Sequence, residues 1–184
     1  IRLSLVGSEM CIRDRDGSSW AEQNNINTAR NGFGSAGTST LAVQAGGQPN
    51  APTGHVEEWS AKQPVGAWSV TNAMNAARAV IGGFANSTQT AALAFGGETP
   101  PGTAVTGASE QYNGTSFTEV GDMNTGRRCS GGAGTITAGL AAGHQTTGAV
   151  AVTETWDGSS WTEVADLNSA RAYGVCMGIQ TSAL

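Results

Sequence analysis

Apolar and polar residues alternate along several short stretches of the chain, and these stretches end in paired glycines. The clearest examples are residues 41–47 (LAVQAGG) and 91–97 (AALAFGG), and a third copy, residues 140–144 (LAAGH), has His144 in place of the second glycine. Period-two alternation predicts half-buried strands, and the glycines predict the turns that end them. Histidine is compatible with such a turn because it is enriched among residues of positive φ.

These strands belong to a longer unit that recurs along the chain. The string DGSSW occurs at residues 16–20 and again at 157–161, with a looser copy, NGTSF, at 113–117. In this register four aromatic residues are equivalent, with separations of 48, 49 and 44 residues: Trp20, Trp68, Phe117 and Trp161. Seven residues after each aromatic comes an asparagine, and ten residues after it an arginine: Asn27, Asn75, Asn124 and Asn168, then Arg30, Arg78, Arg127 and Arg171. A period of this length predicts one four-stranded blade per copy.

A strand of the pattern Glu-x-aromatic closes each unit. Its copies are Glu57 to Trp59, Glu110 to Tyr112 and Glu154 to Trp156. Because the glutamates recur as regularly as the arginines, we expect arginine-to-glutamate contacts within or between blades, with both residue types acting as scaffold. Residues 60–67 replace the short turn before Trp68 and include Pro64, so that outer hairpin is expected to be longer.

The order of these elements, from arginine through a Gly-rich strand, an apolar Gly-Gly strand and a Glu-x-aromatic strand to the aromatic strand, resembles the kelch repeat. The resemblance covers about residues 16–184 and implies an all-β fold, a kelch-like β-propeller or propeller fragment with four-stranded antiparallel blades of about 44–49 residues. The Gly-rich segments 32–37, 82–83 and 131–134 are then the innermost strands, where side chains have little room.

The chain accommodates about three full blades and a split or truncated fourth. Pairing of the two incomplete ends would close a four-bladed ring, and we favour the alternative of a fragment of a six- or seven-bladed ring. Residues 1–15 match no copy, and residues 4–15 resemble a translated sequencing-adaptor artefact. We therefore divide the chain into an artefactual segment, residues 1–15, and a repeat array, residues 16–184.

Composition excludes several classes of partner. The net charge is −5 and Lys62 is the only lysine, so the chain lacks the clustered cations that a nucleic-acid surface needs. No apolar run approaches the roughly 18 residues of a membrane span. The spacing of three cysteines and two histidines predicts neither a metal site nor a cofactor site. Open blade edges would allow a homo-oligomer.

The loops after the glycine pairs are the candidate binding surface, because they vary while their flanking strands keep register. The alternative is that these loops are insertions that the fold tolerates and that have no binding role, which would produce the same variation in length. The candidate residues are Gln48, Asn50, Thr53, Glu98, Thr99, Thr103, His144, Gln145 and Thr146. The threonines, prolines, glutamines and glycines of these loops favour neutral polar contacts with a glycan or protein surface. We expect both histidines, His55 and His144, to be exposed.

The sequence favours a non-catalytic binding or structural module, for example in a surface or phage tail-associated protein, with an extracellular or virion-associated location. No G-x-S-x-G context or Ser/His/Asp order predicts a catalytic residue. The alternative is a fragment of a kelch-like sugar-active enzyme of the oxidase, epimerase or hydrolase type, with its pocket on the propeller axis. That alternative predicts titratable residues around the axis, where the sequence has mostly glycine and alanine.

Overall fold

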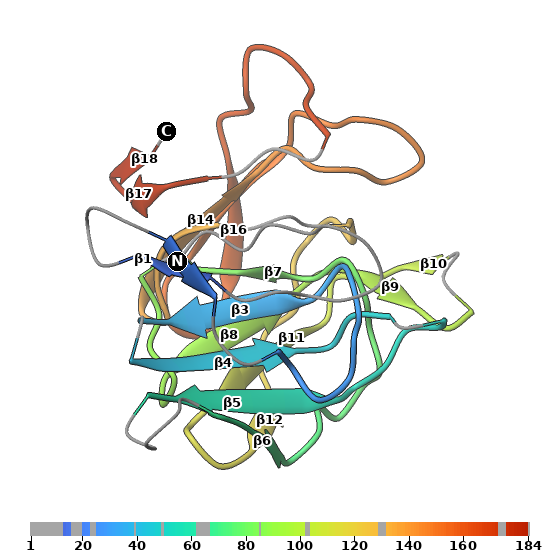
Figure 1. The fold of residues 1–184 in the computed structure, drawn as a ribbon. Helices are drawn as coiled ribbons and strands as arrows, with labels where there is room; N and C mark the ends of the chain where they lie inside the picture. The colour runs from blue at the N-terminus through green and yellow to red at the C-terminus, as the bar shows by residue number, and fades with distance from the viewer. Residues whose placement is uncertain are drawn as a thin grey trace.

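The computed structural model describes residues 13–15, 20–22, 25–38, 40–48, 50–61, 67–84, 86–101, 104–128, 132–172 and 176–183. These residues form short strands joined by turns and loops, and no helix occurs among them (Figure 1). The all-β prediction is therefore confirmed. The same residues contain no helix with the length and hydrophobicity that a membrane span needs.

Twelve of the strands form three four-stranded antiparallel sheets, each with its strands in chain order. The first sheet contains β3 (Gly34–Gly37), β4 (Leu41–Ala45), β5 (Val56–Ser60) and β6 (Ala67–Thr71). The second contains β7 (Gly82–Gly83), β8 (Ala92–Phe95), β11 (Ser109–Tyr112) and β12 (Phe117–Glu119). The third contains β13 (Ala133–Thr135), β14 (Ala138–Ala142), β15 (Thr153–Trp156) and β16 (Trp161–Val164). These sheets correspond to three complete copies of the repeat.

Three two-stranded pairs accompany the sheets: β1 (Arg13–Arg15) with β2 (Trp20–Glu22), β9 (Glu98–Thr99) with β10 (Ala104–Val105), and β17 (Gly178–Ile179) with β18 (Ser182–Ala183). The β9–β10 hairpin projects from the second sheet, at the right of Figure 1. The arrangement is like the blades of a β-propeller, and the strands in the described ranges do not close into a ring.

The two outer strands of the second and third sheets are aligned by an aromatic pair. Tyr112 lies opposite Phe117 and Trp156 opposite Trp161, with ring centroids 4.8 and 5.4 Å apart. Four-residue turns, 113–116 and 157–160, join these strands, and each has its glycine at positive φ as a tight hairpin requires. In the first sheet β5 ends at Ser60 and β6 begins at Ala67, which is the longer separation that the sequence predicted, and residues 62–66 between them lie outside the described residues.

The β17–β18 pair has the local geometry of the inner half of a complete sheet. Gly37, Gly134 and Gly178 all have positive φ, and at each a Cβ would collide with a carbonyl oxygen of the following strand. The Gln180 amide donates to the carbonyls of Trp156 and Gly139, so this pair is fixed to the third sheet. First strands of neighbouring sheets also lie together, β3 against β7 and β13 against β17.

The hydrophobic core lies between the sheets, as expected for a repeat array. One cluster joins the first and second sheets through Val43, Ala45 and Val56 on one side and Ala92, Ala94, Tyr112 and Phe117 on the other. A second cluster joins Phe84, Leu93 and Phe95 of the second sheet to Ala141, Trp156 and Trp161 of the third. Each sheet therefore depends on its neighbour for burial of its apolar face.

The β1–β2 pair has the register of two outer strands, because Arg13 lies opposite Glu22 as Glu154 lies opposite Glu163. Residues 1–12 and 16–19 lie outside the described residues. The division of the chain at residue 16, and the artefactual origin of the segment before it, stay predictions.

Candidate functional site

A linker, the segment that leads from one sheet into the next, binds a glutamate of the sheet that follows it. The ion pairs are Arg30–Glu57 at 2.8 Å, Arg78–Glu110 at 2.8 Å and Arg127–Glu154 at 2.5 Å. All six side chains are at most 2% exposed. Burial lowers the pKa of Arg30, and the charge and hydrogen bond of Glu57 oppose that change.

Backbone N–H groups complete the contacts of each carboxylate. Glu154 accepts hydrogen bonds from the backbone nitrogens of Asn124 at 2.7 Å and Thr125 at 3.3 Å, in addition to the Arg127 guanidinium. Asn27 and Thr28 donate in the same way to Glu57, and Asn75 and Ala76 to Glu110. We call this set of two N–H groups and one arginine a carboxylate cradle. A buried ion pair with these partners is a structural contact. Removal of either side chain would leave an unpaired buried charge and destabilise the fold.

The last linker contains the same residue types, but its cradle is uncovered. Arg171 is exposed, whereas Arg30, Arg78 and Arg127 are 4%, 0% and 0% exposed. Leu167 is half-buried, whereas the equivalent residues Ile26, Met74 and Met123 are 5–6% exposed. No carboxylate in the described parts of the chain forms an ion pair with Arg171.

The loops after β4, β8 and β14 meet the linkers at one end of the sheets, which we call the loop face. The second residue of each glycine pair fixes its loop to the next linker: Gly47 N–H donates to the Arg78 carbonyl at 2.9 Å, Gly97 to Arg127 at 2.9 Å and His144 to Arg171 at 2.8 Å. His144 has φ of 86°, so its occupation of a positive-φ position is confirmed.

The predicted binding residues differ in how far they reach solvent. Asn50 is exposed, while Gln48, Thr53, Thr99, Gln145 and Thr146 are half-buried. Backbone bonds to the linkers hold several of them, since Gln48 pairs with Asn31 and Gln145 with Arg128. Thr103 lies outside the described residues, as do the side chains of Trp20 and Trp68.

Two of the predicted binding residues are buried instead of exposed. The expectation of exposure holds for His55 and is wrong for His144, which is 1% exposed. A backbone hydrogen bond from His144 to the Arg171 carbonyl fixes this turn against the last linker. Glu98 is 9% exposed and accepts a 2.5 Å hydrogen bond from Nε of Arg128, whose Nη1 donates to the Thr146 carbonyl. These residues hold the loops in place and do not present a surface to a ligand.

Sequence reasoning missed the side-chain contacts between neighbouring sheets. Tyr112 donates its hydroxyl to Glu58 at 2.7 Å, and burial raises the pKa of this tyrosine. Trp161 Nε1 donates to the Ser109 hydroxyl at 3.1 Å. The doubled arginine at 127–128 was the one visible signal for the Arg128–Glu98 contact, because the other linkers have a single arginine.

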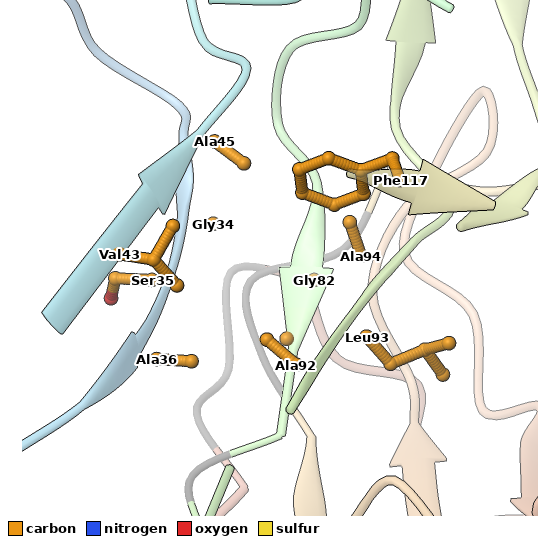
Figure 2. Close-up of a pocket in the computed structure, with 11 residues that line it drawn as sticks. Gly34, Ser35, Ala36, Val43, Ala45, Gly82, Ala92, Leu93, Ala94 and Phe117 are labelled. Atoms are coloured by element: carbon orange, nitrogen blue, oxygen red, sulfur yellow. The ribbon is translucent and has the colours of Figure 1, made fainter. Parts of the chain in front are cut away.

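A small hollow lies between the first and second sheets, and Figure 2 shows small side chains facing it from both sides. Its volume is about 20 Å³, enough for about one water molecule. Glycine, alanine and other mainly apolar residues line it, including Ala36, Val43, Ala92 and Phe117. We interpret it as a packing gap, because it lacks the convergent polar groups of a ligand pocket.

Titratable groups do not gather elsewhere in the described ranges. These ranges contain no group of three His, Cys, Asp or Glu residues close enough to hold a metal ion. The described first strands β3, β7 and β13 contain only glycine, alanine, serine and threonine.

The comparisons with known proteins bear on the fold. No protein-family model and no curated protein matches the sequence. The solved structure of YjhT is similar, with a TM-score of 0.65 over 86% of this chain and 52% of the other, at 15% sequence identity. The chain thus spans about half the length of YjhT. At this identity the likeness shows a shared β-sheet arrangement and no more.

Proposed function

We propose that the chain is part of a kelch-like β-propeller that acts as a non-catalytic binding module. Its recognition surface is the loop face, and its ligand is a glycan or the surface of another protein. An extracellular or virion-associated location fits this role.

The observation that carries the proposal is the contrast between the bases and the tips of the loops. All three loops are fixed by the same hydrogen bond to the following linker. Beyond that bond they differ, because only the second loop contains the β9–β10 hairpin. A rigid base with a variable tip is the usual design of a recognition surface on a repeat scaffold.

The exposed tips are neutral. Asn50 in the first loop, Pro100, Pro101 and Ala104 in the second, and residues 147–149 in the third are exposed. Glu98 and Arg128, at the bases of the second and third loops, form an ion pair with each other. The described strands of the β9–β10 hairpin are held at their base by that ion pair and by the Thr99–Ala104 strand pair.

No observation favours the alternative, a sugar-active enzyme, over a binding module. An enzyme pocket near the first strands needs an acid, a base or a nucleophile there, and the described residues of β3, β7 and β13 offer only small side chains. We therefore place recognition on the loop face.

The test uses the purified 184-residue chain on an array of immobilised neutral and acidic oligosaccharides, and as the target of a phage-displayed peptide library. The key variant replaces residues 100–103 with Asn-Gly, which shortens the hairpin to a two-residue turn and leaves Glu98 and Arg128 in place. The control is Thr115→Ala in the turn at the opposite end of the second sheet. We expect the hairpin variant to lose ligand binding and the control to keep it, with both retaining the thermal transition.

Two results would overturn this proposal. One is the absence of any ligand from both the array and the library. The other is a ligand whose affinity falls as much with Thr115→Ala as with the shortened hairpin, because that would place recognition away from the loop face.

A further inference from the structure

Asparagine precedes glycine at two places in the chain, Asn31–Gly32 in the linker before β3 and Asn113–Gly114 in the outer turn of the second sheet. This pair is prone to spontaneous deamidation, because glycine has no side chain to shield its backbone nitrogen from the asparagine amide carbon. Both asparagines are exposed, so neither sequence nor exposure separates them. The hydrogen bonds around each pair do.

Closure of the succinimide ring requires the peptide between the two residues to rotate. The glycine nitrogen reaches the asparagine Cγ only when the peptide plane turns about the asparagine ψ angle. The asparagine carbonyl oxygen lies in that plane and must move with the nitrogen. A hydrogen bond to that carbonyl therefore opposes the reaction.

The peptide between Asn31 and Gly32 is held on both sides. Asn31 N–H donates to the Gln48 carbonyl at 3.2 Å, and the Asn31 carbonyl accepts from Gln48 N–H at 2.9 Å. The Gly32 carbonyl accepts a hydrogen bond from Val80 N–H. Rotation of this peptide would break the bond from Gln48 and separate the loop after β4 from its linker.

The peptide between Asn113 and Gly114 is free of such bonds. In the described parts of the chain, neither the Asn113 carbonyl nor the Gly114 N–H has a hydrogen-bond partner. The turn is closed by other groups, since Asn113 N–H donates to the Ser116 carbonyl at 3.2 Å. This peptide can therefore rotate without breaking a hydrogen bond of its own.

The Asn113 side chain is polarised for attack. Its Oδ1 accepts hydrogen bonds from Thr115 N–H at 2.9 Å and Ser116 N–H at 3.0 Å. These donors draw electron density from Cγ and stabilise the negative oxygen that forms when the Gly114 nitrogen attacks. Asn113 is exposed, so ammonia can leave directly into solvent.

The third sheet shows that the turn accommodates the product. Asp157 has the place of Asn113, and its Oδ1 accepts hydrogen bonds from Ser159 N–H and Ser160 N–H, both at 2.8 Å. The bonds from Ser160 and Ser159 hold the pKa of Asp157 well below its usual value, so this turn stabilises a carboxylate. An aspartate at position 113 would make the same contacts.

We propose that Asn113 is a site of spontaneous modification, at which the Gly114 nitrogen displaces the side-chain amide and water converts the resulting succinimide to aspartate or isoaspartate. In the first step a bond forms between the Gly114 nitrogen and Asn113 Cγ, and the amide group leaves with the Gly114 proton as ammonia. In the second, one water molecule cleaves a ring C–N bond, which restores an N–H group and yields a carboxylate. No oxidant or reductant is needed.

The modification adds one negative charge to the second sheet and gives its turn the charge of the third. The turn lies at the end of the sheet opposite the loop face, so this inference goes beyond the proposed function.

The test incubates the purified 184-residue chain in mildly alkaline buffer and follows ammonia release, while tandem mass spectrometry of digested samples locates each converted asparagine. In the folded chain we expect Asn113 to convert at least about tenfold faster than Asn31, because the bonds from Gln48 and Val80 must break first at Asn31. In urea, where those bonds are lost, the two residues should convert at similar rates.

Two matched variants separate the sites. Asn113→Gln should abolish the fast phase of ammonia release, because the longer side chain closes its ring much more slowly. Asn31→Gln is the control and should leave the fast phase unchanged. Asn113→Asp should elute from an ion-exchange column with the aspartate form of the incubated chain and keep the thermal transition of the unmodified chain.

Three outcomes would overturn the proposal. The first is equal conversion of Asn31 and Asn113 in the folded chain. The second is a fast phase of ammonia release that persists in Asn113→Gln. The third is conversion of Asn113 in urea but not in the folded chain, which would show that the turn protects this residue.

Discussion

The two interfaces between complete sheets have the same strand register but are filled differently. Between the second and third sheets, the rings of Phe84, Phe95 and Trp161 have centroids 5.0 to 5.9 Å apart, and the Phe84 ring occupies the space that Gly139 leaves. Between the first and second sheets, Ala36 and Ala92 hold the equivalent positions and border the hollow of about 20 Å³ (Figure 2). The backbone thus accepts either a large residue facing glycine or two small residues.

The largest effect should come from emptying the aromatic interface. Phe84 is fully buried, and Phe84→Ala would leave a cavity between the second and third sheets. We expect a loss of about 3–5 kcal/mol in the free energy of unfolding, measured by urea denaturation. Ala36→Gly at the equivalent position of the first sheet should have a much smaller effect. A loss below about 1 kcal/mol for Phe84→Ala would show that the interface collapses without penalty.

A smaller loss should follow from adding one methyl group to the same interface. A Cβ at Gly139 would collide with the Phe84 ring, so Gly139→Ala should destabilise the chain by about 1–3 kcal/mol in the same assay. Gly148→Ala is the matched control, because no atom lies within 4 Å of its Cβ position. In a Phe84→Ala background Gly139→Ala should become nearly neutral. An unchanged penalty there would refute steric complementarity between the two positions.

The hollow in the other interface predicts a change of opposite sign. Ala36→Val places a β-branched side chain on a strand beside the hollow, so we expect a gain of about 0.5–1 kcal/mol in the free energy of unfolding. Thermal denaturation at one protein concentration measures it. A loss of stability would mean that the hollow is too narrow for the added methyl groups.

The smallest effect concerns the hairpin turns of the second and third sheets. Asp157 Oδ1 accepts hydrogen bonds from the N–H groups of Ser160 and Ser159, and these bonds hold the pKa of this carboxyl well below its usual value. Because the folded-state pKa is depressed, the stabilisation is present above the unfolded pKa of about 4 and is lost as the pH falls below it. Asn113, at the same place in the second sheet, cannot titrate.

Asp157→Asn tests this difference by giving the third sheet the turn of the second. The melting-temperature difference between the unmodified chain and the variant should be small at pH 7 and should shrink toward pH 3. A difference that does not change with pH would show that the titration of Asp157 is not linked to folding.

Much of the fold was predictable because its signals are local and repeated. The alternating runs around residues 41–47 and 91–97 form β4 and β8, and the Asn-Gly and Asp-Gly turns lie at the predicted hairpins. The common register of Arg78 and Glu110 also anticipated their contact, which the structure contains. The loop residues were harder to place. Glu98 and His144 stand in a variable segment, and nothing local indicates that a neighbouring linker covers them.

The sequence by itself determined the strands, the turns and the repeat register of this protein, because each follows from residues within one unit of the chain. Only the tertiary structure decided which side chains are buried and which pairs complement each other. Arg127 and Arg171 have the same place in the repeat, yet Arg127 is buried and Arg171 is exposed. Phe84 and Gly139 fit together across sheets that are far apart in sequence. The burial of a side chain depends on which residues of the next unit pack against it, and the sequence pattern within one unit does not specify those residues.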